Sequence, residues 1–217
     1  MKTIKTLGFI SLLSIASFSS QAEVINFETM AEATGSHGES AWDSLNLTYS
    51  GFSVSISATK DGNAAFAYLD SGNGGLGVCG EVYDILDANK ITNSDANLCN
   101  PGSDDNVTVG ESLFLTFDTN VIIENLWFNN NHDTDHSLLG DTVTLDGSNY
   151  TFDNGGVYQP SAVNSSFYLA AGTTFEIAYF DEPFYLERMQ IKVPETSSLI
   201  LLLVGMLGLS LLRKRII

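Results

Sequence analysis

Basic residues, histidine, cysteine and proline are scarce in this chain of 217 residues, and these shortages narrow the classes of function. Nine Lys and Arg stand against 26 Asp and Glu, which gives a formal net charge of −17. Such an acidic surface repels phosphate backbones and anionic lipid headgroups, so we expect no nucleic-acid partner. Divalent cations, cationic surfaces and neutral glycans remain as partners, and solubility alone is the simplest reason for the charge.

Sequence signatures of catalysis are missing as well. The chain contains no Gly-x-Ser-x-Gly and no His-Glu-x-x-His, and neither cysteine has a histidine near it in sequence. Gly72, Gly74 and Gly77 have the spacing of a dinucleotide-binding loop, but they lack the flanking strand and helix that such a loop needs. We therefore expect a protein that is not an enzyme.

Long apolar runs occur only at the two ends of the chain. Near the N-terminus, Lys2 and Lys5 precede an apolar stretch at residues 7–18, and Ser20-Gln21-Ala22 has the small-x-small form of a signal-peptidase site. This pattern predicts a signal peptide over residues 1–22, with cleavage after Ala22. The mature chain would then begin at Glu23 and be exported.

At the C-terminus, residues 197–212 carry no charged side chain and are followed by Arg213-Lys214-Arg215. The run is shorter than the ~20 residues that comfortably span a bilayer. Its basic end favours the cytoplasmic side of a membrane. We expect a transmembrane helix that anchors or addresses the protein and takes no part in its fold.

Pro194 and Glu195 stand directly before this run, and Thr196 follows them. A Pro-Glu motif, an apolar helix and a basic end together resemble the PEP-CTERM sorting signal of Gram-negative bacteria, in which a second proline stands at the position of Thr196. The resemblance covers residues 193–217 and implies processing near Pro194 by an exosortase, a membrane-embedded protease-transpeptidase. It further implies a place at the cell surface or in the extracellular matrix, associated with exopolysaccharide and biofilm.

Residues 23–192 have the length of one domain with a sizeable core, and they hold four basic residues against 25 acidic ones. Apolar and polar residues alternate there with the period of two that is typical of half-buried strands. The strand candidates are residues 24–27, 45–49, 52–58, 64–69, 113–117, 121–128, 142–145, 150–152, 167–169, 175–179 and 185–193.

About ten short strands separated by Gly, Asn and Asp predict an all-β fold, an antiparallel β-sandwich of jelly-roll type, with a closed barrel as the alternative. Asp146-Gly147 has the residue types of a tight hairpin, and Ser50-Gly51 joins two strands. Val82, Ile85 and Leu86 predict one short helix. Residues 70–79, with Gly-Leu-Gly-Val before Cys79, also loosely resemble a segment of exported PEP-CTERM proteins of the β-sandwich type.

Cys79 and Cys99 are the only cysteines of the chain. An oxidising compartment favours a disulfide between them, which on the chain-entropy model would stabilise the fold by roughly 3 kcal/mol. Two buried free thiols are the alternative. A zinc site held by the two cysteines alone is not expected, because they supply only half of the usual four ligands.

Several polar side chains are candidates for binding a metal ion. Carboxylates in the turn-rich segments suit the oxygen chemistry of calcium, although none has EF-hand spacing; they are Asp70, Asp104, Asp105 and Asp181. His132 and His136 flank Asp133 in a second cluster, which needs a loop or a helical turn to bring the two imidazoles to one ion. For both sets, a solvated polar loop is the simpler interpretation.

Exposed aromatic rings are the usual platform for sugars, because a ring face packs on the apolar face of a pyranose. Trp42 and Tyr158 lie in polar, turn-rich stretches and are the best candidates for binding glycan. Trp127 lies in an apolar strand and is expected in the core.

The sequence therefore favours a non-enzymatic exported surface or matrix protein that binds glycan and calcium. The alternative is a secreted hydrolase that acts on polysaccharide through His132, Asp133 and His136 or through a pair of carboxylates. A purely structural surface protein without a small ligand is the third hypothesis.

Overall fold

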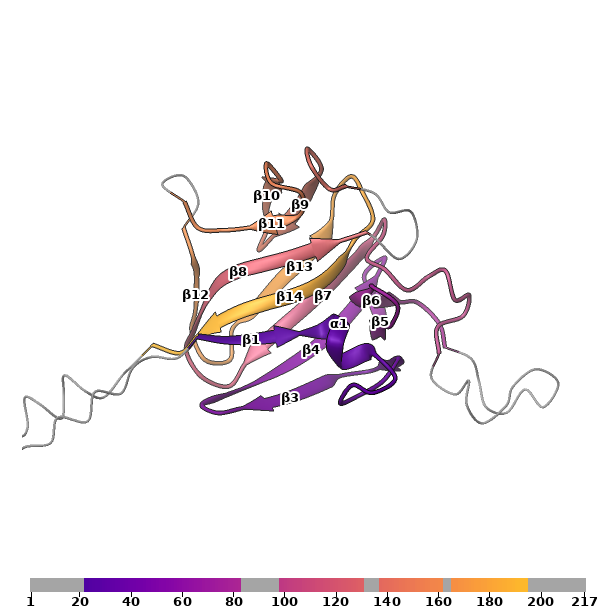
Figure 1. Ribbon diagram of the computed structural model, residues 1–217, viewed down its shortest axis with the longest axis horizontal. Helices are drawn as coiled ribbons and strands as arrows, with labels where there is room; N and C mark the ends of the chain where they lie inside the picture. Colours follow the sequence, from indigo (N-terminus) through magenta and orange to yellow (C-terminus); the bar gives the residue numbers. More distant parts are fainter. Residues whose placement is uncertain (1–21, 83–97, 131–136, 162–164, 195–217) are drawn as a thin grey trace, which may run out of the picture. The chain divides into compact units, whose positions relative to one another are not determined.

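The computed structural model describes residues 22–82, 98–130, 137–161 and 165–194. In these ranges the chain is all-β with one short helix, so the predicted fold class is confirmed (Figure 1). The elements are β1 Ala22–Asn26, α1 Phe27–Ala31, β2 Ser40–Trp42, β3 Leu45–Tyr49, β4 Phe52–Lys60, β5 Asn63–Asp70, β6 Gly75–Cys79, β7 Glu111–Phe117, β8 Val121–Asn129, β9 Thr142–Leu145, β10 Ser148–Thr151, β11 Val157–Tyr158, β12 Phe167–Leu169, β13 Thr174–Tyr179 and β14 Tyr185–Lys192.

The strands form one antiparallel sheet in the order β10-β9-β13-β7-β4-β5-β6-β14-β8-β11. Four strands pair outside this path: β1 with β14, β12 with β8, β2 with β5 and β3 with β4. β5 joins the two halves, because Asn63–Ala65 pair with β4 whereas Phe66–Asp70 pair with β6. The narrower prediction of a jelly-roll sandwich stays a prediction. A sandwich has two separate sheets, whereas here hydrogen-bonded pairing continues from one half to the other through β5.

Alternating side chains supply the core, as the period-two pattern predicts. In β4, Phe52, Val54, Ile56 and Ala58 are buried, while the serines between them are partly or fully exposed. β7 and β13 repeat the pattern and join the same apolar cluster. In these three strands, alternation therefore turns one face toward the core and leaves the other face wholly or partly exposed.

Trp127 was expected in the core, and this prediction is wrong. Its neighbours Leu126 and Phe128 are buried, so alternation along β8 turns the indole to the outer face, where it is only partly buried. The guanidinium of Arg188 on β14 lies 5.4 Å from the ring centroid. A cation over an aromatic face explains how this large ring is accommodated outside the core.

The only helix among the described residues, α1, begins where a strand was expected to continue. Asn26 caps it, because its side-chain oxygen accepts a hydrogen bond of 2.9 Å from the backbone N–H of Thr29. Phe27, Met30 and Ala31 are buried, and α1 packs against β5, β6 and β14. The predicted helix around Val82 lies mostly outside the described residues; Val82 itself forms an isolated bridge with Cys99.

Cys79 and Cys99 form a disulfide, which confirms the predicted pairing. The bond belongs to a small second cluster that also contains Ala41 and Tyr68, with Phe66 and Val82 packed against it. Phe66 and Tyr68 alternate along β5 with Ala65, Ala67 and Leu69, which belong to the main core. The disulfide therefore holds the chain at Cys99 against the outer side of β5 and β6.

The first and last strands of the domain are neighbours. Ala22 pairs with Lys192 and Asn26 pairs with Arg188, and β14 also pairs along β8 (Figure 1). The expected signal peptide and the C-terminal sorting segment lie outside the described residues, apart from Ala22, Val193 and Pro194. Among the described residues, no helix has the length and apolar composition needed to span a bilayer.

We predict that the Cys79→Ser/Cys99→Ser double variant unfolds with a free energy about 3 kcal/mol lower than the oxidised protein, because its unfolded chain is less constrained. Urea denaturation followed by tryptophan fluorescence measures the difference. A reductant should lower the urea midpoint of the wild-type protein and leave the double variant unchanged. A wild-type midpoint that does not respond to reductant contradicts the prediction.

Candidate functional site

The sheet nearly closes on itself where its two end strands, β10 and β11, approach each other. The hairpin that carries β10 turns through Asp146 and Gly147, both with positive φ, so the tight turn expected from these two residues is confirmed. Across the gap, the hydroxyl of Tyr150 donates a hydrogen bond of 3.4 Å to the carbonyl oxygen of Val157 on β11. We call this gap between β10 and the strands β11 and β12 the seam.

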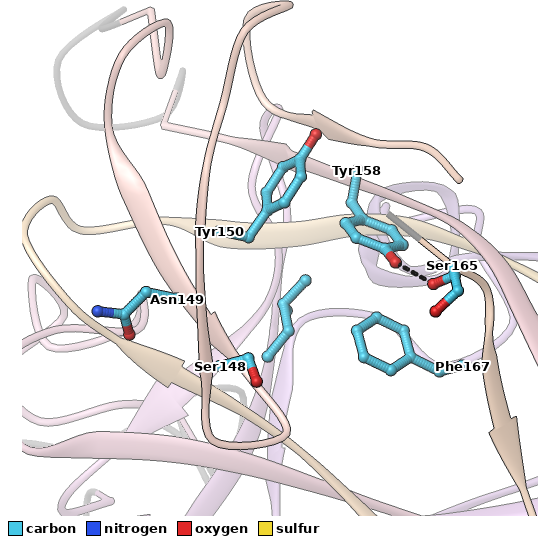
Figure 2. Close-up of a pocket in the computed structure, with 7 residues that line it drawn as sticks. Ser148, Asn149, Tyr150, Tyr158, Ser165 and Phe167 are labelled. Carbon is cyan, nitrogen blue, oxygen red and sulfur yellow. Dashed lines mark hydrogen bonds between the residues drawn. The ribbon is translucent and has the colours of Figure 1, made fainter. Parts of the chain in front are cut away.

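A pocket of about 210 Å³ lies in the seam. Figure 2 shows the rings of Tyr150, Tyr158 and Phe167 around it, with Ser148 and Asn149 on one side and Ser165 on the other. Leu145 completes the lining. All seven lining residues are uncharged, in a chain with 26 acidic side chains.

The aromatic wall of the pocket is part of a packed chain of rings. The ring centroids of Tyr150 and Tyr158 lie 4.8 Å apart, those of Tyr158 and Phe167 lie 5.2 Å apart, and Phe167 continues to Phe175 at 4.7 Å. Edge-to-face and tilted contacts at these distances stabilise the rings in place. The pocket therefore has a preformed apolar wall, because its rings are held by the core behind them.

The polar groups of the pocket lie at its wall and rim. The hydroxyl of Tyr158 donates a 2.5 Å hydrogen bond to the carbonyl oxygen of Ser165. Burial raises the pKa of Tyr150 and of Tyr158. Each hydroxyl donates its one proton to a backbone carbonyl, that of Val157 for Tyr150 and that of Ser165 for Tyr158, and can still accept a hydrogen bond. Ser148, Asn149 and Ser165 are exposed and present hydroxyl and amide groups to solvent.

Of the two aromatic residues predicted to bind glycan, the structure brings only Tyr158 to this pocket. Its side chain is 3% exposed, so it forms a wall and not an open platform. Trp42 lies on β2, is partly buried against the main core, and contacts His37 edge-on at 5.8 Å. The sequence did not single out Tyr150 or Phe167, because their approach to Tyr158 depends on the pairing of β11 and β12 with β8.

The four carboxylates proposed for calcium lie in different surroundings. Asp104 forms an ion pair with Lys60, and Asp105 accepts a hydrogen bond of 2.8 Å from the hydroxyl of Tyr185. Asp181 accepts a hydrogen bond of 2.7 Å from the backbone N–H of Thr142. Asp70 ends β5 and is buried against Gly74, where a Cβ would collide with its carboxylate.

Within the described residues, no three His, Cys, Asp or Glu side chains lie close enough together to hold a metal ion. His132, Asp133 and His136 lie outside these residues. Calcium binding and the histidine cluster therefore stay predictions.

Comparisons with family models, with curated proteins and with solved structures found no match for this chain. The pocket in the seam is thus interpreted from its own chemistry. It offers flat apolar surfaces and neutral hydrogen-bonding groups, and the side chains that line it include no nucleophile paired with a base.

We predict that Tyr158→Phe lowers the free energy of unfolding by about 1 kcal/mol, because the carbonyl of Ser165 loses its hydrogen-bond donor. The matched control is Tyr168→Phe, which removes the same atom from a side chain that is 60% exposed on the outer face. Denaturant unfolding should show a change below about 0.5 kcal/mol for this control. Equal effects of the two changes would show that the Tyr158 hydroxyl does not brace the seam.

Proposed function

We propose that this protein is an exported, non-enzymatic surface or matrix protein that binds a neutral glycan in the seam pocket. The observation that carries the proposal is the lining of that pocket: aromatic rings and uncharged polar groups in a strongly acidic chain. The net charge of the chain alone would favour a cationic partner. The pocket carries no charge, so its ligand would be recognised through apolar contact and neutral hydrogen bonds.

A neutral ligand follows from the cost of desolvation. A charged group that enters a pocket loses its hydration, and this loss is repaid only by an opposite charge or by several hydrogen bonds. The side chains of Tyr150, Tyr158 and Phe167 supply no charge. Hydroxyl groups of a ligand lose less on entering, and the rim residues can bond to them as donors or acceptors.

A sugar fits the combination of surfaces in the seam. A pyranose has apolar C–H faces and a polar edge, and the pocket places ring faces beside Ser148, Asn149 and Ser165. Small-molecule sites are generally of this kind, mostly apolar with a few polar groups that fix orientation. The volume of about 210 Å³ suits one sugar unit or the end of a chain better than a long polymer.

Export is supported by features at both ends of the domain. The signal-peptide pattern before Glu23 and the Pro194-Glu195 segment with its apolar run predict passage through a membrane and processing by an exosortase. The Cys79–Cys99 disulfide suits an oxidising compartment. We therefore place the proposed binding at the cell surface or in the extracellular matrix, with exopolysaccharide as the ligand class and biofilm as the setting.

We predict that the exported protein binds neutral hexose oligosaccharides and that Tyr150→Ala weakens this binding at least tenfold, which is about 1.4 kcal/mol. Isothermal titration with glucan and galactan fragments measures the affinity. Tyr168→Ala is the matched control, because it removes a tyrosine ring from the outer face and should leave the affinity unchanged. No heat with neutral fragments, or equal binding by Tyr150→Ala and the wild-type protein, would overturn the proposal.

We also predict two processing events in the native host. Mass spectrometry of the purified protein should find an N-terminus at Glu23 and a C-terminus near Pro194. A retained N-terminal segment would contradict export by a cleaved signal peptide. A retained residue 217 would contradict processing at the C-terminal motif.

A further inference from the structure

A lysine and two carboxylates from separate segments meet at the end of β4. Lys60 is the last residue of β4 and lies opposite Glu111, the first residue of β7. The Nζ of Lys60 lies 2.5 Å from Oδ1 of Asp104 and 3.0 Å from Oε1 of Glu111. One amine is therefore in contact with two acids at once, one on a loop and one on the neighbouring strand.

Glu111 is fully buried and firmly oriented. Its side chain is 0% exposed, and Oε2 accepts hydrogen bonds from the backbone N–H of Thr108 at 2.8 Å and from the Thr108 hydroxyl at 3.2 Å. These bonds leave Oε1 directed at Lys60. Burial raises the pKa of Glu111, although the bonds from Thr108 and Lys60 oppose this effect, so the carboxyl is suited to take up a proton.

Asp104 is held in place by the backbone on its far side. Its Oδ2 accepts a hydrogen bond of 3.2 Å from the N–H of Gly80, while Oδ1 contacts Lys60. A side chain at position 80 would crowd both partners, because a Cβ there would lie 2.9 Å from Cδ of Lys60 and 3.0 Å from Oδ2 of Asp104. Glycine thus lets the backbone approach the carboxyl and donate to the oxygen that would gain negative charge during an attack on Cγ.

We propose that Lys60 and Asp104 join through an isopeptide bond, with Glu111 as the acid-base group of the reaction. The site holds the parts that amide formation needs: an amine at the carboxyl, a buried acid within reach of the amine, and a donor for the developing oxyanion. Holding the reacting groups in contact replaces the collision of two separate molecules and so removes the entropic part of the barrier.

The reaction balances without any further reagent. The Lys60 ammonium passes one proton to Glu111, and its freed lone pair attacks Cγ of Asp104. The C–N bond forms and a C–O bond of the carboxyl breaks. The proton held by Glu111 and a second proton from the nitrogen leave with that oxygen as one water molecule, so Glu111 returns to its starting state.

The role of Glu111 follows from the protonation of the lysine. Burial alone would lower the pKa of Lys60, but its bonds to Asp104 and Glu111 outweigh burial and raise it. The amine is thus charged at the start and cannot attack until a neighbour accepts a proton. Glu111 is the side chain placed to do so, at 3.0 Å.

Such a bond would close a second covalent loop in the same corner of the fold as the disulfide. The loop from Lys60 to Asp104 contains Cys79 and Cys99. An amide survives reduction, so the loop would remain closed when the disulfide opens.

Peptide mapping of the exported protein, reduced before digestion, tests the bond. We expect a branched peptide that joins the Lys60 and Asp104 segments and weighs one water molecule less than the two separate peptides. Lys60→Arg, Asp104→Ala and Glu111→Gln should each abolish it. In Asp104→Asn, the joined peptide should form with loss of ammonia in place of water.

The pair Lys192 and Glu124 is the internal control, because its atoms lie 4.0 Å apart without a buried third acid. No branched peptide should join these two residues. The proposal is overturned if wild-type chains that carry the Cys79–Cys99 disulfide yield the Lys60 and Asp104 peptides unlinked. It is also overturned if Glu111→Gln forms the bond as completely as the wild-type protein, because Glu111 would then have no part in the reaction.

Discussion

The apolar side chains on the inner face of the sheet have to be shielded from water, so the strands must form one continuous sheet around them. This continuity depends on β5. It pairs with β4 through Asn63–Ala65 and with β6 through Phe66–Asp70, so this one strand links the two parts of the sheet. The partner changes at a run of small and aromatic residues, and Ala65 and Ala67 there are buried in the main core. The continuous strand order through β5 ends in β10 on one side and β11 on the other, and these are the strands that flank the seam.

Charge is distributed unevenly over the domain. In the described ranges every basic side chain has an acidic partner: Lys60 has Asp104 and Glu111, Arg188 has Glu187 at 2.8 Å, and Lys192 has Glu124 at 4.0 Å. The excess carboxylates are therefore not neutralised by lysine or arginine. The seven residues that line the seam pocket carry no charge, in a chain with a formal net charge of −17. The chemistry of the proposed ligand therefore differs from the chemistry of the rest of the surface.

The sequence was sufficient to predict the fold class and most strands, because alternation directly reports burial on one face. It was also sufficient for the Asp146-Gly147 turn, where the residue types carry the signal. The disulfide was predictable because the chain has only two cysteines and its N-terminal pattern predicts export. Alternation did not predict that Trp127 faces outward, since an apolar strand with apolar residues on both faces has no readable phase. The pocket was not predicted, because the approach of Tyr150, Tyr158 and Phe167 depends on how β11 and β12 pair with β8, and no local motif encodes that pairing. The Lys60 cluster joins three segments that are distant in sequence.

The position of β14 has a mechanical consequence. Its last residues pair with β1 on one side and with β8 on the other, so the strand that leads to the C-terminal segment is enclosed by two ladders. Backbone hydrogen bonds between antiparallel strands lie across the strand direction. Tension on the chain beyond Pro194 would act along β14. The hydrogen bonds to β1 and to β8 would then be loaded in shear, so many bonds would share the force at once instead of breaking one by one. A domain attached through that end would therefore resist mechanical unfolding under flow better than a domain attached through an edge strand.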